Sequence, residues 1–320
     1  MKPILNKNDV EINIKKAKKI LENGDLVIFP TETVYGLGGN ATDKSAIKKI
    51  YNIKNRPSNN PLICHFKNIS SIEKDFVIND ASYELANKFW PGPLTLILEK
   101  KEASNINPML SNHNKFVGCR IPKHPTAQTL LQNLEFPIAA PSANISTKLS
   151  STKIIHLSKK LKDNIFILDG GKSFYGLEST IINASNDNPK ILRLGSITLE
   201  VIEKIIPSII LENYSNFSNQ SPGQQIKHYS PNLPLRINVN SVLKGEALLN
   251  FGTNNLKSEI MELNLSTSGN LEEAGKNLYD FLHKLDNSQS IGIAVAPVPN
   301  NNLGKTINDR LKRASKTNLN

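Results

Sequence analysis

A stretch near the amino terminus, PTETVYGLGGNATD from Pro30 to Asp43, has the residue types needed to bind a small polar ligand. Its hydroxyl-bearing and glycine residues include Thr31, Thr33, Tyr35, Gly36, Gly38 and Gly39. Hydroxyls donate and accept hydrogen bonds, and glycines let backbone amides approach a ligand closely. An apolar run, Leu26 to Phe29, precedes the stretch, and Asp43 can cap a helix after it. We therefore predict a ligand-binding loop between a buried strand and a helix.

Two cations follow this helix in the segment KNRPSNNPL, which runs from Lys54 to Leu62. Lys54 and Arg56 are separated by one residue, and two prolines and Asn60 restrict the turn after them. An ammonium and a planar guanidinium held in this way can bind the same triphosphate. Considered alone, the segment could equally be an exposed basic turn.

Further polar residues lie at or just past the ends of predicted strands, in GCRIP, APSANIS and ILRLG. They are Arg120, Ser142, Asn144 and Arg193. Loops at strand ends converge on one crevice in sheets of this kind, so we expect these groups to meet in space. Any one of them could instead be a cap or a surface ion pair.

The glycines from Gly36 to Ala41, GLGGNA, also fit the dinucleotide-binding pattern GxGxxG/A. Residues 30–35 separate the end of the apolar run from Gly36, whereas the pattern needs its first glycine directly at the strand end. The position about twenty residues further on is Arg56, where the pattern needs an acid. Both departures argue against a nicotinamide cofactor.

The elements that must position these residues predict an α/β fold. Predicted strands lie at 26–29, 62–66, 94–98, 116–120, 136–139, 165–168, 179–182 and 190–194. Predicted helices lie at 10–21, 46–53, 81–89, 125–132, 152–160 and 198–205. Because strands and helices do not follow a strict β-α-β order, we expect a twisted mixed sheet flanked by helices.

The pattern breaks at Pro207, and the polar stretch 212–225 reads as a linker. It ends in the motif SPGQQIKHYSP, Ser221 to Pro231. Apolar runs at 235–239, 246–251 and 291–295 and helices at 271–285 and 301–315 then predict a small open parallel sheet. The predicted organisation is a first domain over 1–206, a linker over 207–232 and a second domain over 233–320.

Length and composition agree with two globular domains. The chain has 320 residues, of which 38% are hydrophobic and 21% charged. The net charge of +11 permits an anionic partner such as nucleotide or RNA, although solvated lysines explain most of it. Cys64 and Cys119 form no CxxC pair, so we expect a reducing, cytoplasmic compartment without disulfides. No segment approaches the roughly 20 apolar residues that cross a bilayer, so we expect no membrane association.

Taken together, the motifs resemble those of the YrdC family. They are PTETVYGLG, KNRPSNNPL, WPGPLT at 90–95, APSANIS at 140–146 and ESTI at 178–181. The linker motif and the terminal NDRLKRA resemble the longer members, which are threonylcarbamoyl-AMP synthases. The resemblance covers nearly the whole chain. It implies a large twisted mixed-sheet YrdC-like domain joined by a linker to a smaller C-terminal α/β, Rossmann-like domain.

The resemblance also implies an activity, that of a nucleotidyltransferase. Such enzymes combine L-threonine, bicarbonate and ATP into threonylcarbamoyl-adenylate and release pyrophosphate. The product serves threonylcarbamoyladenosine formation in tRNA, through downstream transferase proteins. ATP brings Mg²⁺, which is held through the phosphates, and no metal-ligating residues are predicted in the protein.

Carried over by motif, the threonine-binding residues would be Thr33, His65, Arg120, Ala140 and Ser179. The ATP-binding residues would be Lys54, Arg56, Asn60, Phe116, Ser142, Asn144, Ser150, Arg193 and Tyr229. Arg120 suits the threonine carboxylate, and Lys54 and Arg56 suit the phosphates. Alternatively, His65 is an ordinary strand histidine and Ser150 the N-cap of the following helix.

The linker motif departs from the family pattern, because Gln224, Gln225 and Ile226 stand where relatives often carry Met-Lys-Tyr. His228 and Tyr229 are retained, and this segment could close over the site as a lid.

Two other functions are weighed. A non-catalytic module that binds double-stranded RNA would fit the basic composition. A related carbamoyl-transfer enzyme would need zinc-finger or acyl-phosphatase modules that the sequence lacks.

Overall fold

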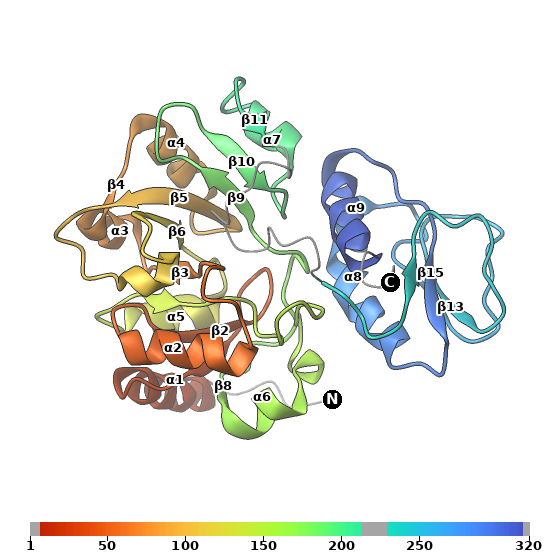
Figure 1. The fold of residues 1–320 in the computed structure, drawn as a ribbon, viewed down its shortest axis with the longest axis horizontal. Coiled ribbons are helices and arrows are strands. Elements are labelled where there is room, and N and C mark those ends of the chain that lie inside the picture. The colour runs from red at the N-terminus through yellow and green to blue at the C-terminus, as the bar shows by residue number, and fades with distance from the viewer. Residues whose placement is uncertain (1–6, 213–228, 316–320) are drawn as a thin grey trace.

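The computed structural model describes residues 7–212 and 229–315, which form a large and a small domain (Figure 1). The large domain contains an eleven-stranded sheet, and the small domain contains a four-stranded sheet. This confirms the predicted α/β class, with a mixed sheet followed by a smaller C-terminal domain. None of the helices in the described part of the chain is long and apolar enough to cross a membrane.

The large sheet mixes parallel and antiparallel pairs. Its strands are β1 (Val27–Phe29), β2 (Gly36–Asn40), β3 (Ile63–His65), β4 (Phe76–Val77), β5 (Leu94–Lys100), β6 (Phe116–Arg120), β7 (Ile138–Ala139), β8 (Phe166–Ile167), β9 (Thr180–Asn183), β10 (Lys190–Arg193) and β11 (Ile210–Leu211). Their order is β11-β10-β9-β5-β6-β3-β7-β2-β1-β8, with β4 beside β5. The central pair β3 and β6 is parallel, so His65 and Arg120 lie side by side at the ends of their strands.

Helices cover both faces of this sheet, as the alternation along β1 shows. Val27 and Phe29 pack with α1 (Lys7–Glu22) and α5 (Pro125–Gln132), whereas Ile28 packs with α2 (Lys44–Lys54) on the other face. The remaining helices of this domain are α3 (Ile69–Asp75), α4 (Asp80–Phe89), α6 (Lys159–Asn164), α7 (Leu199–Glu203) and the 3-10 helices η1 (Pro108–Ser111) and η2 (Ile154–His156).

The glycine-rich segment is a strand and not the predicted loop. β2 pairs antiparallel with β1, so the loop is confined to 30–35. A Cβ on Gly38 would lie 2.7 Å from Cγ2 of Ile138 and 2.8 Å from Cε1 of Phe29. Gly39 is similarly enclosed, with Cδ2 of Leu26 at 2.8 Å. The prediction that these two glycines approach a ligand is therefore wrong, because their missing side chains let β2 pack tightly in the core.

Two other segments differ from the sequence-based expectation. The helix predicted at 152–160 is divided into η2 and α6, because Ser158 has an extended backbone and caps α6, where its Oγ accepts a hydrogen bond from the amide of Leu161 at 3.4 Å. Within the stretch assigned to the linker, β11 pairs parallel with β10. Of the lid motif, Ser221 to Pro231, the part from Ser221 to His228 lies outside the described residues.

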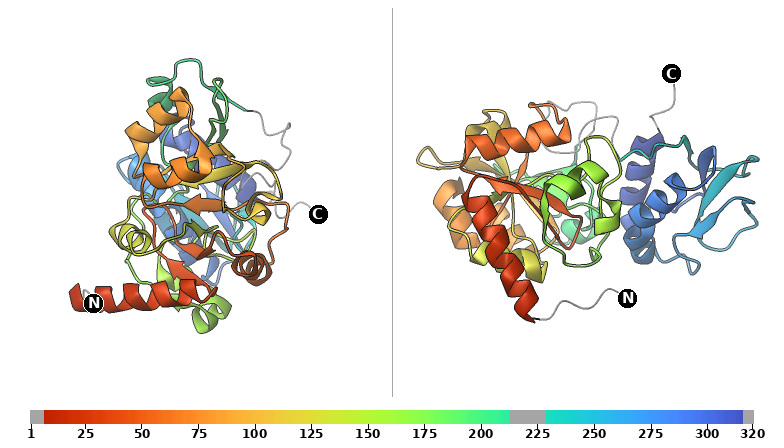
Figure 2. Two further views of the ribbon diagram at one scale, coloured as in Figure 1. Left: turned by 90° about the vertical axis from the view of Figure 1, so that its left-hand side faces the viewer. Right: turned by 90° about the horizontal axis from the view of Figure 1, so that it is seen from below.

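The small domain is the predicted open parallel sheet. Its strands are β12 (Leu235–Arg236), β13 (Glu246–Asn250), β14 (Glu262–Asn264) and β15 (Gly292–Val295), in the order β12-β15-β13-β14. Its helices, α8 (Leu271–Asp286) and α9 (Asn302–Ser315), lie on the side of this sheet that faces the large domain (Figures 1 and 2). Leu149 and Leu177 of the large domain belong to the same apolar cluster as Leu278 and Ile307, so the two domains share a core.

Replacement of Gly38 by alanine tests the tight packing of β2. We expect Gly38→Ala to lower the free energy of unfolding by about 1–3 kcal/mol, because the new methyl group overlaps Ile138 and Phe29. Urea unfolding measures this change. Ile138→Ala should cost less in the Gly38→Ala background than in the wild type, because it removes one of the overlapping groups. Strictly additive costs would contradict the packing described.

Candidate active site

Most of the predicted residues converge on one cavity beside the small domain. Those that line it are Thr33, Arg56, His65, Arg120, Ala140, Ser142, Ser179, Arg193 and Tyr229. They come from the loop after β1, the turn after α2, the ends of β3, β6 and β10, and segments near β7 and β9. Tyr229 alone comes from the segment before β12. The predicted meeting in one crevice is therefore confirmed for Arg120, Ser142 and Arg193, whereas Asn144 lies outside the lining.

Arg120, the last residue of β6, is fixed by oxygen atoms of the loop after β1. Its Nη2 donates to Oε1 of Glu32 at 2.8 Å and to Oγ1 of Thr33 at 2.9 Å, and its Nε donates to the carbonyl of Gly92 at 3.3 Å. Arg120 and Glu32 are both buried. Within the described residues Nη1 of Arg120 makes no hydrogen bond, and Oε2 of Glu32 has no partner. The arginine thus keeps a donor for a ligand carboxylate while Glu32 balances its charge.

His65 lies beside Arg120 in the paired strands and is also buried. Burial, and next the charge of Arg120, lowers the pKa of its imidazole to about 3. The ring therefore stays neutral near pH 7 and can act as both donor and acceptor. Its edge meets Phe29, with ring centroids 5.8 Å apart, and its Nδ1 has no partner among the described residues. A neutral ring nitrogen of this kind suits a ligand hydroxyl.

Lys54 and Arg56 bring buried positive charge to the end of α2, where Arg56 lines the cavity and Lys54 lies outside its lining. Asn55 between them adopts a left-handed conformation (φ 52°) that ends α2 and turns both side chains inward. Nζ of Lys54 donates to the carbonyls of Ser142, at 2.6 Å, and Asn144. Burial lowers the pKa of Lys54 well below its usual value.

The guanidinium of Arg56 is held by the turn that follows it. It donates from Nη2 to Oδ1 of Asn60 at 2.5 Å and to the carbonyl of Pro61 at 2.7 Å, and burial lowers its pKa to about 10. Within residues 7–212 and 229–315 neither Lys54 nor Arg56 has a carboxylate at ion-pair distance. This wall of the cavity is therefore preorganised for an anion.

Ser179 and Arg193 form a third part of the lining. Nη2 of Arg193 donates to the carbonyl of Ser179 at 2.8 Å and to its Oγ at 3.1 Å. The Ser179 hydroxyl also lies 2.8 Å from Oγ1 of Thr95 on β5. Burial lowers the pKa of Arg193, so this charge too has been removed from bulk water. The hydroxyl is consequently held at a fixed position next to the guanidinium.

The other predicted residues lie outside the lining, and most of them support it. Lys54 and Asn60 contact Ser142 and Arg56, as described above. The side chain of Asn144 accepts a hydrogen bond from Oγ of Ser142 and donates to the carbonyl of Lys148 at 2.7 Å. Ser150 donates to Oε1 of Glu178 at 2.6 Å, so it does not cap a helix. These residues can determine where the lining groups point without touching a ligand themselves.

Phe116 begins the strand that ends at Arg120, so alternation places both on one face of the sheet. The phenyl ring is half-buried against the apolar cluster of Ile97, Ile181 and Leu192. It lies outside the cavity lining. Phe116 therefore extends the same face away from the cavity.

Two carboxylates at the site were not predicted from the sequence. Glu32 and Glu178 lie inside the motifs PTET and EST, but acidic residues are unexpected next to anionic ligands. Their arginine partners lie 88 and 132 residues away in the chain, so only the folded structure reveals the pairing. The sequence offered one signal for these carboxylates: Glu32 and Glu178 directly precede Thr33 and Ser179, which were predicted to bind threonine.

The neutral, buried His65 predicts a specific pH dependence of stability. Its pKa is about 3 when folded and about 6.5 when unfolded, so below pH 6.5 the unfolded chain binds a proton that the folded chain does not. Stability is therefore lost as the pH falls, by about 2 kcal/mol between pH 7 and pH 5. Urea unfolding at both pH values should show a smaller loss for His65→Asn. The same change at the exposed His113 serves as the control, and equal losses in all three proteins would contradict the burial of a neutral imidazole.

Comparison with known proteins adds to this geometry. The Sua5/YciO/YrdC family, described as "Telomere recombination", matches residues 19–195. The family described as "Threonylcarbamoyl-AMP synthase, C-terminal domain" matches residues 197–316. A threonylcarbamoyl-AMP synthase of Bacillus subtilis is 36% identical, over 97% of this chain and 94% of that protein. One from Pyrococcus abyssi is 35% identical, over 95% of this chain and 94% of that protein.

Solved structures agree with the sequence relatives. The crystal structure of Pyrococcus abyssi Sua5 complexed with L-threonine matches with a TM-score of 0.87 and 32% identity, over 98% of this chain and 96% of that chain. Escherichia coli YciO matches at 22% identity with a TM-score of 0.51 and covers 58% of this chain, so it supports the fold of the large domain alone. The chain therefore belongs to the Sua5/YrdC family, in its two-domain form.

Proposed function

We propose that this protein is a threonylcarbamoyl-AMP synthase, which forms threonylcarbamoyl-adenylate and pyrophosphate from L-threonine, bicarbonate and ATP. The observation that carries the proposal is the cavity itself. One of its walls holds Arg120 among hydroxyl groups and a neutral imidazole, and another holds Arg56 and Arg193. An amino acid and a triphosphate need these two environments side by side. The full-length relatives with this name and the Pyrococcus abyssi complex with L-threonine support the same assignment.

The reaction consists of two steps that bring anions together. The threonine amine attacks the carbon of bicarbonate or carbon dioxide and forms a C–N bond, which gives N-carboxythreonine. With carbon dioxide the nitrogen loses a proton, and with bicarbonate a C–O bond also breaks, so that water leaves. An oxygen of the new carboxylate then attacks the α-phosphorus of ATP, and the bond to the β-phosphate oxygen breaks to release pyrophosphate. No covalent intermediate with the protein is required. The protein contributes positioning and neutralisation of charge.

In this proposal, the Arg120 wall holds threonine. The free Nη1 of Arg120 binds the threonine carboxylate, while Thr33 and Ser179 offer hydroxyls and His65 offers a neutral ring nitrogen to the threonine side chain. Ala140 contributes its backbone to the same wall. Because Glu32 already neutralises Arg120, threonine can enter and leave without a large electrostatic penalty.

In this proposal, the second wall binds ATP. Arg56 and Arg193 face the phosphates, with Ser142 and Tyr229 beside them. Four residues outside the lining hold the lining groups in place through the hydrogen bonds described above: Lys54, Asn60, Asn144 and Ser150. Phe116 and the apolar cluster around it lie further along the same sheet face and would accommodate the base.

We further propose that Mg²⁺ enters with ATP as part of the substrate and is held through phosphate oxygens and water. The two carboxylates at the cavity, Glu32 and Glu178, are paired with Arg120 and Arg310, so they are poor candidates for metal ligands. Among the described residues no group of three or more His, Cys, Asp or Glu side chains is arranged to hold a metal ion.

The product is an unstable mixed anhydride, so we propose that it passes to the proteins that transfer the threonylcarbamoyl group to tRNA. The buried free thiols of Cys64 and Cys119 fit a reducing, cytoplasmic location. RNA binding by the basic surface would accompany this role.

Pyrophosphate release from ATP tests the function, with threonine and bicarbonate each omitted in turn. We expect release only when both are present. Turnover without threonine would indicate a different carbamoyl-transfer enzyme. Salt-sensitive binding of double-stranded RNA without any ATP turnover would indicate a binding module.

Conservative replacements of Arg120 and Arg56 test whether the two walls bind different substrates. Arg120→Lys should raise the KM for threonine about tenfold or more with little effect on that for ATP, because lysine cannot make the planar contacts of a guanidinium. Arg56→Lys should do the reverse. Arg236→Lys is the matched control, because Arg236 pairs with Glu246 in the small domain, away from the cavity. Equal effects of both site variants on both substrates would contradict the assignment.

A further inference from the structure

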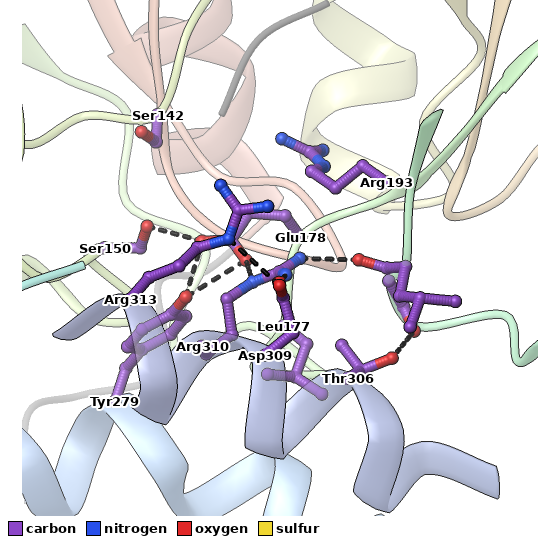
Figure 3. A network of polar contacts seen from close by, with 12 residues as sticks. Ser142, Ser150, Leu177, Glu178, Arg193, Tyr279, Thr306, Asp309, Arg310 and Arg313 are labelled. Carbon is purple, nitrogen blue, oxygen red and sulfur yellow. Dashed lines mark hydrogen bonds and ion pairs between the residues drawn. The ribbon is translucent and has the colours of Figure 1, made fainter. Parts of the chain in front are cut away.

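Glu178 is the point at which the small domain contacts the cavity (Figure 3). This buried residue lines the cavity and accepts hydrogen bonds from both domains. Ser150 of the large domain donates to Oε1 at 2.6 Å. Tyr279 of α8 donates to the same carboxylate, with oxygen distances of 2.8 and 3.0 Å, and Nε of Arg310 on α9 donates to Oε2 at 2.9 Å.

Arg310 makes a second contact, with the chain just after Arg193. Its Nη2 donates to the carbonyl of Leu194 at 2.7 Å, and Oγ1 of Thr306, one turn earlier on α9, donates to the carbonyl of Gly195 at 3.0 Å. A Cβ on Gly195 would lie 2.2 Å from the amide nitrogen of Thr180, so this segment rests directly on the backbone that carries Ser179. The end of β10 is therefore held between α9 and the start of β9.

A third contact joins the small domain to Tyr229, which lines the cavity. The guanidinium carbon of Arg310 lies 4.8 Å from the centre of the Tyr229 ring, within the range of a cation–π interaction. The Tyr279 ring lies 6.0 Å from the same ring. Tyr229 has a left-handed backbone conformation (φ 63°), which a non-glycine residue adopts only when its surroundings hold it there.

The charges of this cluster fit one another. Burial raises the pKa of the Glu178 carboxyl, but the charges of Arg310 and Arg193 and the hydrogen bonds from Arg310 and Ser150 more than offset this, so the pKa is lowered overall. A buried carboxylate–guanidinium pair often stabilises a fold no more than apolar groups of the same size would. Their presence therefore points to a purpose beyond attachment of the domains.

We propose that Tyr279 and Arg310 of the small domain are positioning residues of the active site, which hold Glu178, the end of β10 and Tyr229 in the arrangement that binds ATP. The small domain is then a structural part of the nucleotide wall. The contacts do not extend to Arg120, Thr33 or His65, and within the threonine wall they reach only Ser179, through the end of β10. This inference rests on the proposed function.

Conservative variants of the full chain test this role. Tyr279→Phe removes one hydroxyl, and Arg310→Lys keeps the charge but loses the planar guanidinium. Tyr83→Phe and Arg236→Lys are matched controls, since Tyr83 is exposed on α4 and Arg236 lies in the small domain away from the cavity. KM and kcat for ATP and threonine are measured from pyrophosphate release. The thermal shift caused by a non-hydrolysable ATP analogue measures nucleotide binding without turnover.

We expect Tyr279→Phe and Arg310→Lys to raise the KM for ATP about tenfold, the effect of losing one hydrogen bond to a buried charged group. The KM for threonine should change less than that for ATP, because only Ser179 of the threonine wall adjoins the cluster, and the thermal shift with the analogue should shrink. Glu178→Gln should have the same effect, and adding Tyr279→Phe to it should cause no further loss, because both act through one contact. Both controls should match the wild type.

Variants that melt earlier but keep wild-type KM values and analogue shifts at low temperature would overturn the inference, because the cluster would then only join the domains. Losses from Glu178→Gln and Tyr279→Phe that simply add would overturn it as well. If Arg310→Lys does not fold, Tyr279→Phe decides the question alone. If the proposed function itself is wrong, the wild type will release no pyrophosphate in response to threonine, which distinguishes that outcome from failure of this inference.

Discussion

Buried positive charge is the constraint on which the cavity depends. Arg56, Arg120 and Arg193 are buried and line one small cavity, and the buried Lys54 and Arg310 contact the lining residues Ser142 and Glu178. Isolated charges are costly to bury, so each needs compensation. Glu32 and Glu178 pair with two of them, and carbonyl and amide oxygens surround Lys54 and Arg56. The remaining positive potential is available to anionic substrates.

The fold supplies this arrangement through its mixed sheet. The parallel pairing of β3 with β6 puts His65 next to Arg120 at one edge, and the reversal of direction between β9 and β10 brings Ser179 against Arg193. Helix α2 ends at a left-handed asparagine, which delivers two cations to the same edge. Helices α8 and α9 of the small domain then contact Glu178 and Tyr229, which line the cavity. Preorganised groups of this kind need little rearrangement during the reaction, which is the principal way in which such a site accelerates it.

Much of this site could be predicted from the sequence, because the motifs fall where strands end. Arg120 and Arg193 are the last residues of β6 and β10, so the strand pattern alone placed them at the edge of the sheet. Strand propensity could not reveal β2, because its glycines are poor strand formers that tight packing selects. The apolar pattern at 152–160 did not show the interruption at Ser158. The contact between Glu178 and Arg310 depends on how two domains dock, and no local pattern encodes it.

A structure of the protein with L-threonine and a non-hydrolysable ATP analogue bound together would test the central claim most directly. We predict that both ligands share the one cavity, with the threonine carboxylate on Arg120 and the phosphates against Arg56 and Arg193. The threonine nitrogen should then face the α-phosphate, with room between them for one carboxyl group. Ligands bound in separate cavities, or phosphates remote from Arg56 and Arg193, would contradict the account.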